Sequence, residues 1–556
     1  MNSTSLARRQ FIRISSFIGV TSILIGACAA PAAAPNSGAT NAPAASKAKE
    51  KILVVAVDGD VDTFDPCCTV GTKPSQTTIQ NTFDQLTQYA QTEKKLANGQ
   101  SYIAVDTSKI DGMLAEKWEM APDGKITFTI RKGLKFADGE PITAQAIADG
   151  YRRIYEVGGI SSFLLIMGGI DKPEQITADG DKVIFVPKQA NTLVSMNNVM
   201  HNTSAISPKD IKARATDKDK WAAEYFKKSL AAGSGPFVLE TYKSGDQITL
   251  KARDDYYGGR AKIDKVIQKI VPDPQQRILL LKRGDVDMIM VPPVKDLDEL
   301  EKDPNIKVLS IPSTNNWMLE MNNKIAPFDN KKVRQAFAYA IPYDTLIKQV
   351  YYGRATRLKS PIAEGTPTSD YSFWKYETDP AKAKALLAEA GFADGKGLPA
   401  IKLSIRVGSE EDERAAVIIQ DALKQIGVSA DIEKLAFAAF NEKEQKRELQ
   451  LFIDQWISWV NDPYYHLSWI YSSGSPTIYG NYKNDEVDKL IAKYTLWAGD
   501  PKERDEASKK IQQLVVDDVP NIYLAALNFN VAMRSNISGY AYYNDELNRY
   551  YYMDKN

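Results

Sequence analysis

The sequence predicts an α/β protein of two lobes that are joined by two crossing strands. Strand and helix patterns alternate through most of the chain after residue 50. One strand pattern near residue 317 and another over residues 522–527 lie where the chain is expected to pass between the lobes. The length of 556 residues leaves room for about three compact units of roughly 100–200 residues each.

Composition excludes several classes of function. Lys plus Arg and Asp plus Glu both number 70, so the formal net charge of zero gives no reason to expect nucleic acid as a partner. The only histidines are His201 and His466, and the adjacent Cys67 and Cys68 have no second cysteine pair to complete a metal site. We therefore expect no metal and no cofactor. Adjacent cysteines bridge only through a strained ring, which favours two reduced or individually buried thiols.

The start of the chain is typical of an export signal. Arg8 and Arg9 stand in a basic segment, and residues 14–25 are mainly apolar but too short to span a bilayer reliably, since spanning takes roughly 20 residues. The sequence Ile-Gly-Ala-Cys ending at Cys28 resembles a bacterial lipobox, which implies a lipid-modified N-terminus, with an unlipidated cleaved signal as the alternative. The paired arginines resemble a twin-arginine signal, and an ordinary secretory signal is the alternative.

The segment before residue 51 consists mostly of small residues, which suits a flexible tether. The elements of the predicted first lobe follow it. The continuous apolar run of residues 51–57 indicates a strand buried on both faces, and residues 126–130 alternate as a hairpin strand. Residues 275–283 are helical in pattern and end at Gly284, and residues 286–290 then alternate as a strand.

Residues 315–353 are predicted to contain a crossing strand and two helices. Trp317 begins an alternation of apolar and polar side chains, which indicates a half-buried strand. Asp329 is the expected cap of the first helix, Asp344 can cap the second, and Gly353 allows a left-handed C-terminal cap.

This stretch also carries a family resemblance. Residues 322–353, with Pro327-Phe328, Val333-Arg334-Gln335-Ala336 and Tyr352-Gly353, resemble the bacterial solute-binding proteins of the dipeptide and oligopeptide type, which serve ABC importers. Residues 114–144 and 254–259 match further landmarks of that family. The resemblance implies a type II, cluster C-like periplasmic binding protein fold, with an extra subdomain in the first lobe and a two-strand hinge.

The resemblance and the patterns together set the expected boundaries. We expect a signal peptide over 1–27, a lipidated flexible tether over 28–50, a first lobe over 51–314 with an inserted subdomain near 87–231, a second lobe over 315–526, and a return to the first lobe over 527–556.

The predicted second lobe alternates strands and helices as far as a strand over residues 451–456. Parallel units of this kind bind ligands beyond the carboxyl ends of their strands. The next residues combine two tryptophans with polar side chains, so we expect ligand contacts from Trp456, Trp459, Asn461 and Asp462. The alternative is that both tryptophans fill the core.

Two more residues complete the predicted ligand site. Trp317 lies in the crossing strand, and Thr72 lies in a polar loop that the family places close to the ligand. Peptide-binding members carry Asp where this chain has Trp459, and that Asp pairs with the free amino group of the peptide. One possibility is that another acid, such as Asp462, Glu410 or Glu411, takes the place of this Asp. The other is that the ligand has no free amino terminus, which would be true of an oligosaccharide stacked on Trp459.

The expected function is therefore that of an exported, lipid-anchored receptor of an ABC importer, on the periplasmic or cell-surface side of the membrane. We expect a monomer that traps an oligopeptide between two closing lobes and delivers it to the permease, with an oligosaccharide or other solute as the alternative. A carboxylate-dependent hydrolase is the alternative of another class. The sequence contains no Gly-x-Ser-x-Gly or His-Glu-x-x-His motif, and we assign no catalytic residue.

Overall fold

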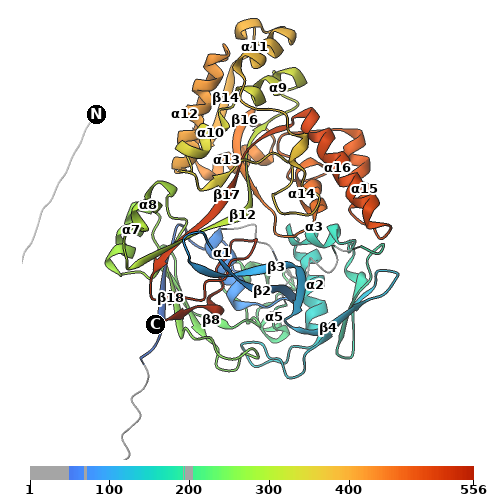
Figure 1. Cartoon of the computed structure of the whole chain (residues 1–556). Coiled ribbons are helices and arrows are strands. Elements are labelled where there is room, and N and C mark those ends of the chain that lie inside the picture. The colour runs from blue at the N-terminus through green and yellow to red at the C-terminus, as the bar shows by residue number, and fades with distance from the viewer. Residues whose placement is uncertain (1–48, 68–71, 159, 192, 194–204) are drawn as a thin grey trace, which may run out of the picture. The chain divides into compact units, whose positions relative to one another are not determined.

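One sheet runs through both lobes of the folded unit (Figure 1). Residues 50–556 form this compact unit. The sheet has 11 strands in the order β15, β14, β16, β12, β17, β11, β1, β10, β9 and β8, with β13 paired to β17. The computed structural model describes residues 49–67, 72–158, 160–191, 193 and 205–556.

Two long strands carry the chain between the lobes, β12 (Ile306–Met321) and β17 (Asn521–Arg534). They pair in antiparallel orientation, with an irregularity in register between Pro312 and Asn316. β17 also pairs with β11 of the first lobe, whereas the end of β12 pairs with β16 of the second lobe. Both predicted crossing strands are present, and they are direct neighbours in the sheet.

In the first lobe, β1 is parallel to both β10 and β11. Its apolar run lies mostly buried between core side chains, as expected for a strand that is covered on both faces. The C-terminal residues Tyr540, Tyr550 and Met553 belong to the same core as Val55 of β1. The strands here are β1 (Ile52–Val57), β8 (Phe237–Lys243), β9 (Gln247–Ala252), β10 (Lys265–Ile270) and β11 (Met288–Met290).

A smaller antiparallel sheet of four strands, in the order β4, β5, β7 and β6, has its own core around Phe128 and Tyr151. Tyr151 comes from α2, which packs on this sheet. The strands of this part are β2 (Thr87–Lys95), β3 (Ser101–Gly112), β4 (Ala115–Met120), β5 (Ile126–Ile130), β6 (Ile176–Asp179) and β7 (Lys182–Phe185). The helices of the first lobe include α1 (Lys73–Thr82), α2 (Ala144–Val157), α3 (Ile160–Met167), α5 (Pro208–Arg214), α6 (Ala223–Phe226), α7 (Pro274–Arg283) and α8 (Leu297–Leu300).

In the second lobe, β14 is parallel to both β15 and β16, as the alternation of strands and helices predicts. The strands are β14 (Ile401–Arg406), β15 (Ala430–Leu435) and β16 (Leu451–Ile457), with the short β13 (Ala355–Thr356) on β17. The helices are α9 (Lys331–Ala340), α10 (Tyr343–Gln349), α11 (Pro380–Glu389), α12 (Glu410–Gln425), α13 (Phe437–Gln445), α14 (Pro463–Tyr471), α15 (Asp485–Tyr494) and α16 (Pro501–Asp518).

Two predicted helix caps differ from those observed. The side chain of Asn330, not Asp329, caps α9 by accepting a hydrogen bond from the Lys332 amide. α10 begins at Tyr343, so Asp344 lies inside its first turn. Its negative charge there still interacts favourably with the positive end of the helix dipole. In the part of the chain that the structure describes, no helix is both long and apolar enough to cross a bilayer.

Candidate functional site

A cleft of about 780 Å³ lies between the two lobes, within the range of roughly 300–1,000 Å³ that is usual for ligand sites. The segment Met290–Val294 lines it from the first lobe, and Arg406–Glu411 lines it from the second. Gln455 and Ile457 contribute from the carboxyl end of β16, and Asn528 comes from the crossing strand β17. The walls thus include both lobes and the strands that join them.

Charged groups of both signs surround this cleft. Glu410 at the start of α12 forms an ion pair of 2.6 Å with Lys295 of the first lobe. The neighbouring Glu411 accepts a hydrogen bond of 3.4 Å from the Val294 amide. These two contacts join the lobes, and they involve two of the three acids that the sequence offered as partners for a ligand amino group.

On the first-lobe side, the buried Arg277 donates hydrogen bonds to the carbonyls of Val271, Pro272 and Val291. Desolvation by burial lowers the pKa of Arg277. Burial also raises the pKa of Glu546, whose carboxylate lies 3.7 Å from Lys73. The cleft is therefore lined by fixed, partly buried charges as well as by apolar groups.

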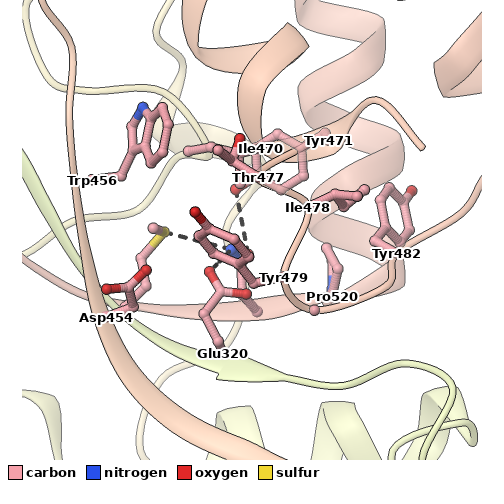
Figure 2. A pocket seen from close by; sticks show the side chains of 13 residues that line it. Glu320, Asp454, Trp456, Ile470, Tyr471, Thr477, Ile478, Tyr479, Tyr482 and Pro520 are labelled. Carbon is pink, nitrogen blue, oxygen red and sulfur yellow. Dashed lines mark hydrogen bonds between the residues drawn. The ribbon is translucent and has the colours of Figure 1, made fainter. Parts of the chain in front are cut away.

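Trp456 stands on the opposite face of β16 from Gln455 and lines a second, much smaller cavity (Figure 2). Its ring lies 5.7 Å from that of Trp469 and 6.4 Å from that of His466. This cavity measures about 20 Å³, room for about one water molecule. It is too small for a solute in this conformation.

Acidic side chains gather beside the small cavity. Glu320 accepts a hydrogen bond of 2.8 Å from Asn521, and burial raises its pKa to about 8. Arg406 bonds to Glu444 at 3.1 Å and to Asp454 at 3.0 Å. Desolvation, with the nearby Asp454 charge, raises the pKa of Glu444. Because Arg406 also lines the large cleft, it connects the two cavities electrostatically.

The loop after β16 contacts the first lobe. Trp459 is partly buried against the core of the second lobe. The backbone amide of Asn461 donates a hydrogen bond of 3.3 Å to the hydroxyl of Tyr89 in β2. The ring of Phe163 in α3 also lies 4.2 Å from that of Trp469 in α14. The predicted loop therefore lies where the two lobes meet.

Asp462 has a different position from the one expected of a ligand contact. It is 3% exposed and caps α14 by accepting a hydrogen bond of 2.8 Å from the Tyr464 amide. Its two oxygens also accept bonds of 2.8 and 2.9 Å from Arg504 of α16. Both oxygens are occupied, so this carboxylate is not available to a ligand ammonium.

Trp317 also lies away from the cleft, fully buried in the core of the second lobe. Its indole nitrogen donates a hydrogen bond of 3.4 Å to Asp412, and its ring packs edge to face on Tyr351. Burial correspondingly raises the pKa of Asp412 to about 6. Trp317 belongs to the core because helices cover that face of the sheet, which corrects the expectation of a ligand contact.

Thr72 caps α1, and its hydroxyl donates a hydrogen bond of 2.7 Å to the Asp60 carbonyl. The next residue, Lys73, lines the large cleft. Cys28 and Cys68 lie outside the described residues, and Cys67 is buried beside Arg153. Among the described residues, no cluster of His, Cys, Asp and Glu has the arrangement of a metal site.

Sequence reasoning missed several residues of the cleft, above all Val291, Val407 and Phe437. Val407 follows β14 at its carboxyl end, so the rule that selected the loop after β16 could also have selected this one. Val291 directly follows β11 and Phe437 lies two residues after β15, and both strands have a parallel neighbour, so the same rule also points to their loops. Their role depends on loop conformation, which the pattern of residue types does not determine.

Comparisons with known proteins agree with this architecture. The sequence profile of the bacterial extracellular solute-binding proteins, family 5 Middle, matches residues 109–477. The chain is 29% identical to the probable D,D-dipeptide-binding periplasmic protein DdpA of Escherichia coli, over 91% of this chain and 94% of that protein. It is 28% identical to the oligopeptide-binding protein AppA of Bacillus subtilis, over 96% and 97% of the two chains.

Solved structures resemble the chain over almost its whole length. The periplasmic binding protein DppA of Helicobacter pylori, in complex with the peptide STSA, has a TM-score of 0.77 at 25% identity and covers 91% of this chain and 98% of its own. AppA of Bacillus subtilis, in complex with a nonapeptide, has a TM-score of 0.76 at 26% identity and covers 91% and 99%.

Proposed function

Because the chain belongs to the bacterial extracellular solute-binding proteins of family 5, we propose that it captures an oligopeptide between its two lobes and delivers it to an ABC permease. The observation that carries this proposal is the cleft of about 780 Å³, whose walls come from both lobes and from the strands that connect them. The relatives named above as peptide binders support the choice of peptide as ligand.

Closure of the lobes follows if the ligand contacts both walls. A ligand shifts a protein toward a closed state only by the difference between its affinities for the closed and the open states. Opening would separate Glu410 from Lys295 and Asn461 from Tyr89, while β12 and β17 keep the lobes connected. We propose that these strands act as the hinge, as in hinge closure around ligands generally.

We propose that the loop of residues 456–461, whose Ile457 lines the cleft, also contacts the bound solute. Trp456 and Trp459 are partly buried and stand where β16 ends, so their ring edges are suited to packing on a solute. Asn461 already contacts the first lobe through Tyr89. Thr72 contributes indirectly, by capping the helix that presents Lys73 to the cleft.

The same proposal places the protein outside the cytoplasm. The family is one of exported solute-binding transport receptors rather than enzymes. We propose that Cys28 becomes the lipidated N-terminus and that residues 29–49 tether a monomeric receptor to the membrane. Intact-mass measurement of the membrane-extracted protein tests this directly, since replacement of Cys28 by Ala should abolish the mass of the acyl chains.

Mass spectrometry of the compounds that co-purify with the protein tests the ligand class. The expected result is a set of oligopeptides released on unfolding and absent from a mock purification. Recovery of oligosaccharides alone, or turnover of a bound oligomer by the purified protein, would contradict the proposal.

A further inference from the structure

Several apolar side chains that line the cleft are exposed to solvent. Among the described residues, the two most exposed large apolar side chains are Phe437, at 64%, and Val407, at 56%, and both line this cleft. Val291 of the first lobe is 50% exposed and lines it too. Leaving such groups in water costs free energy roughly in proportion to their area, so their collection in a ligand cleft indicates an apolar occupant.

Val291 is held in an unusual backbone conformation. Its φ is +47°, which is a genuine outlier for a β-branched residue, and it precedes Pro292, which further restricts its backbone. Arg277 fixes the loop by donating a hydrogen bond of 3.4 Å to the Val291 carbonyl and shorter bonds to Val271 and Pro272. Strain of this kind persists where the surrounding structure imposes it, typically at ligand contacts.

The two apolar residues of the second lobe are held close to each other. The Val407 amide donates a hydrogen bond of 2.8 Å to the Leu435 carbonyl, two residues before Phe437 at the start of α13. Val291 lines the same cleft from the first lobe, three residues before Val294, whose amide donates a hydrogen bond to Glu411. We refer to Val291, Val407 and Phe437 as the apolar clamp.

We propose that the apolar clamp takes one apolar side chain of the bound peptide, aliphatic or aromatic, and so determines a preference for peptides that carry such a residue. This inference rests on the proposed peptide ligand. Both lobes contribute to the clamp, so an apolar side chain there contacts both walls at once. Such a contact exists only in the closed form and therefore favours closure.

The test uses the purified full chain, freed of co-purified ligand by unfolding and refolding. The probe is an equimolar pool of tripeptides in which Leu, Phe, Ser or Asp occupies one position and Ala the others. Retained peptides are measured by mass spectrometry after gel filtration. We expect the wild-type protein to retain Leu or Phe peptides about tenfold over Ser peptides at one position, equivalent to about 1.4 kcal/mol.

Matched variants test whether the peptide preference depends on the apolar clamp or on exposed apolar surface in general. Val407→Ser with Phe437→Ser should reduce the preference to within about twofold, and so should Val291→Gly, which removes the side chain and relieves the positive φ. Val417→Ser with Leu279→Ser changes two side chains that are 50% and 53% exposed outside the cleft, and should keep the wild-type preference. An unchanged preference in the clamp variants, or no preference in the wild-type protein, would overturn the inference.

The same experiment separates failure of the clamp from failure of the proposed function. If the wild-type protein retains no tripeptide, the peptide assignment is contradicted. The apolar dye 1-anilinonaphthalene-8-sulfonate then tests the clamp alone. Dye binding by the wild-type protein that is lost in the Val407→Ser, Phe437→Ser variant supports an apolar ligand of another class, whereas equal dye binding overturns the clamp.

Discussion

Replacing Asp462 by Ala should destabilise the protein without changing the affinity of the folded protein for its ligand. The carboxylate is 3% exposed, caps α14 and makes two charged hydrogen bonds to Arg504. Arg504 also donates to the Tyr494 carbonyl at 3.0 Å, so it ties α16 to α15 as well as to α14. Asp462→Ala therefore removes the bonds that join the start of α14 to Arg504 of α16.

The expected loss follows from these contacts. A lost N-cap costs about 1 kcal/mol, and removing one partner of a buried ion pair costs about 3–5 kcal/mol. The two losses share one carboxylate, so we expect about 3–5 kcal/mol in the free energy of unfolding rather than their sum. Asp462→Asn keeps an acceptor for the cap but loses the charge, so its cost should be smaller.

Urea unfolding followed by tryptophan fluorescence measures this difference, and calorimetric titration of the folded variant measures ligand affinity. Asp485→Ala is the matched control, because Asp485 lies in the first turn of α15 with a side chain that is 77% exposed. The control should change stability by no more than about 0.5 kcal/mol. Wild-type stability of Asp462→Ala combined with lost ligand binding would refute the structural role assigned to this residue.

Three further changes test other parts of the structure. Burial raises the pKa of Glu320 to about 8, so the folded state keeps a proton that the unfolded chain releases above about pH 5. Wild-type stability should therefore fall between about pH 5 and about pH 8, while Glu320→Gln should match it at about pH 5 and exceed it above about pH 8 in urea titrations. Trp459→Ala should weaken ligand binding at least about tenfold in calorimetry, because a large ring is lost from the proposed wall. Lys295→Met should weaken ligand binding by less than about fivefold at low salt, since its pair with the 44% exposed Glu410 is worth about 0.2–1 kcal/mol, and the effect should vanish at about 1 M salt.

Clear results would contradict each of these expectations. Equal stability of Glu320→Gln and the wild-type protein at every pH would show that this carboxyl is not protonated in the folded state. Wild-type affinity of Trp459→Ala would remove that residue from the ligand wall. A salt-independent loss of affinity in Lys295→Met would mean that the ion pair with Glu410 is not the cause.

The regular part of the fold could be predicted because it follows from periodicity. The alternation that begins at Trp317 correctly predicted a crossing strand, and the apolar run of β1 correctly predicted a buried one. Alternation shows which side chains share a face, however, and does not show whether that face meets a helix layer or a cleft. Trp317 was therefore expected at the ligand, whereas α12 and its neighbours cover it.

The sequence contained a helix-cap signal at Asp462, but the tryptophans beside it were given more weight in predicting its role. Asp followed by Pro is a typical start of a helix, and Asp379 and Asp500, each followed by Pro, are the observed caps of α11 and α16. The same pair at Asp462 and Pro463 marks the start of α14, yet the adjacent tryptophans favoured a ligand role. By contrast, a valine does not predict a positive φ, so the backbone conformation of Val291 in the cleft could not be predicted.

Small-angle X-ray scattering with and without a saturating peptide, chosen from those that co-purify, tests lobe closure most directly. Two lobes that close on a ligand in the cleft between them should reduce the radius of gyration when the peptide is added. An unchanged radius, while calorimetry on the same sample shows the peptide to be bound, would contradict the account.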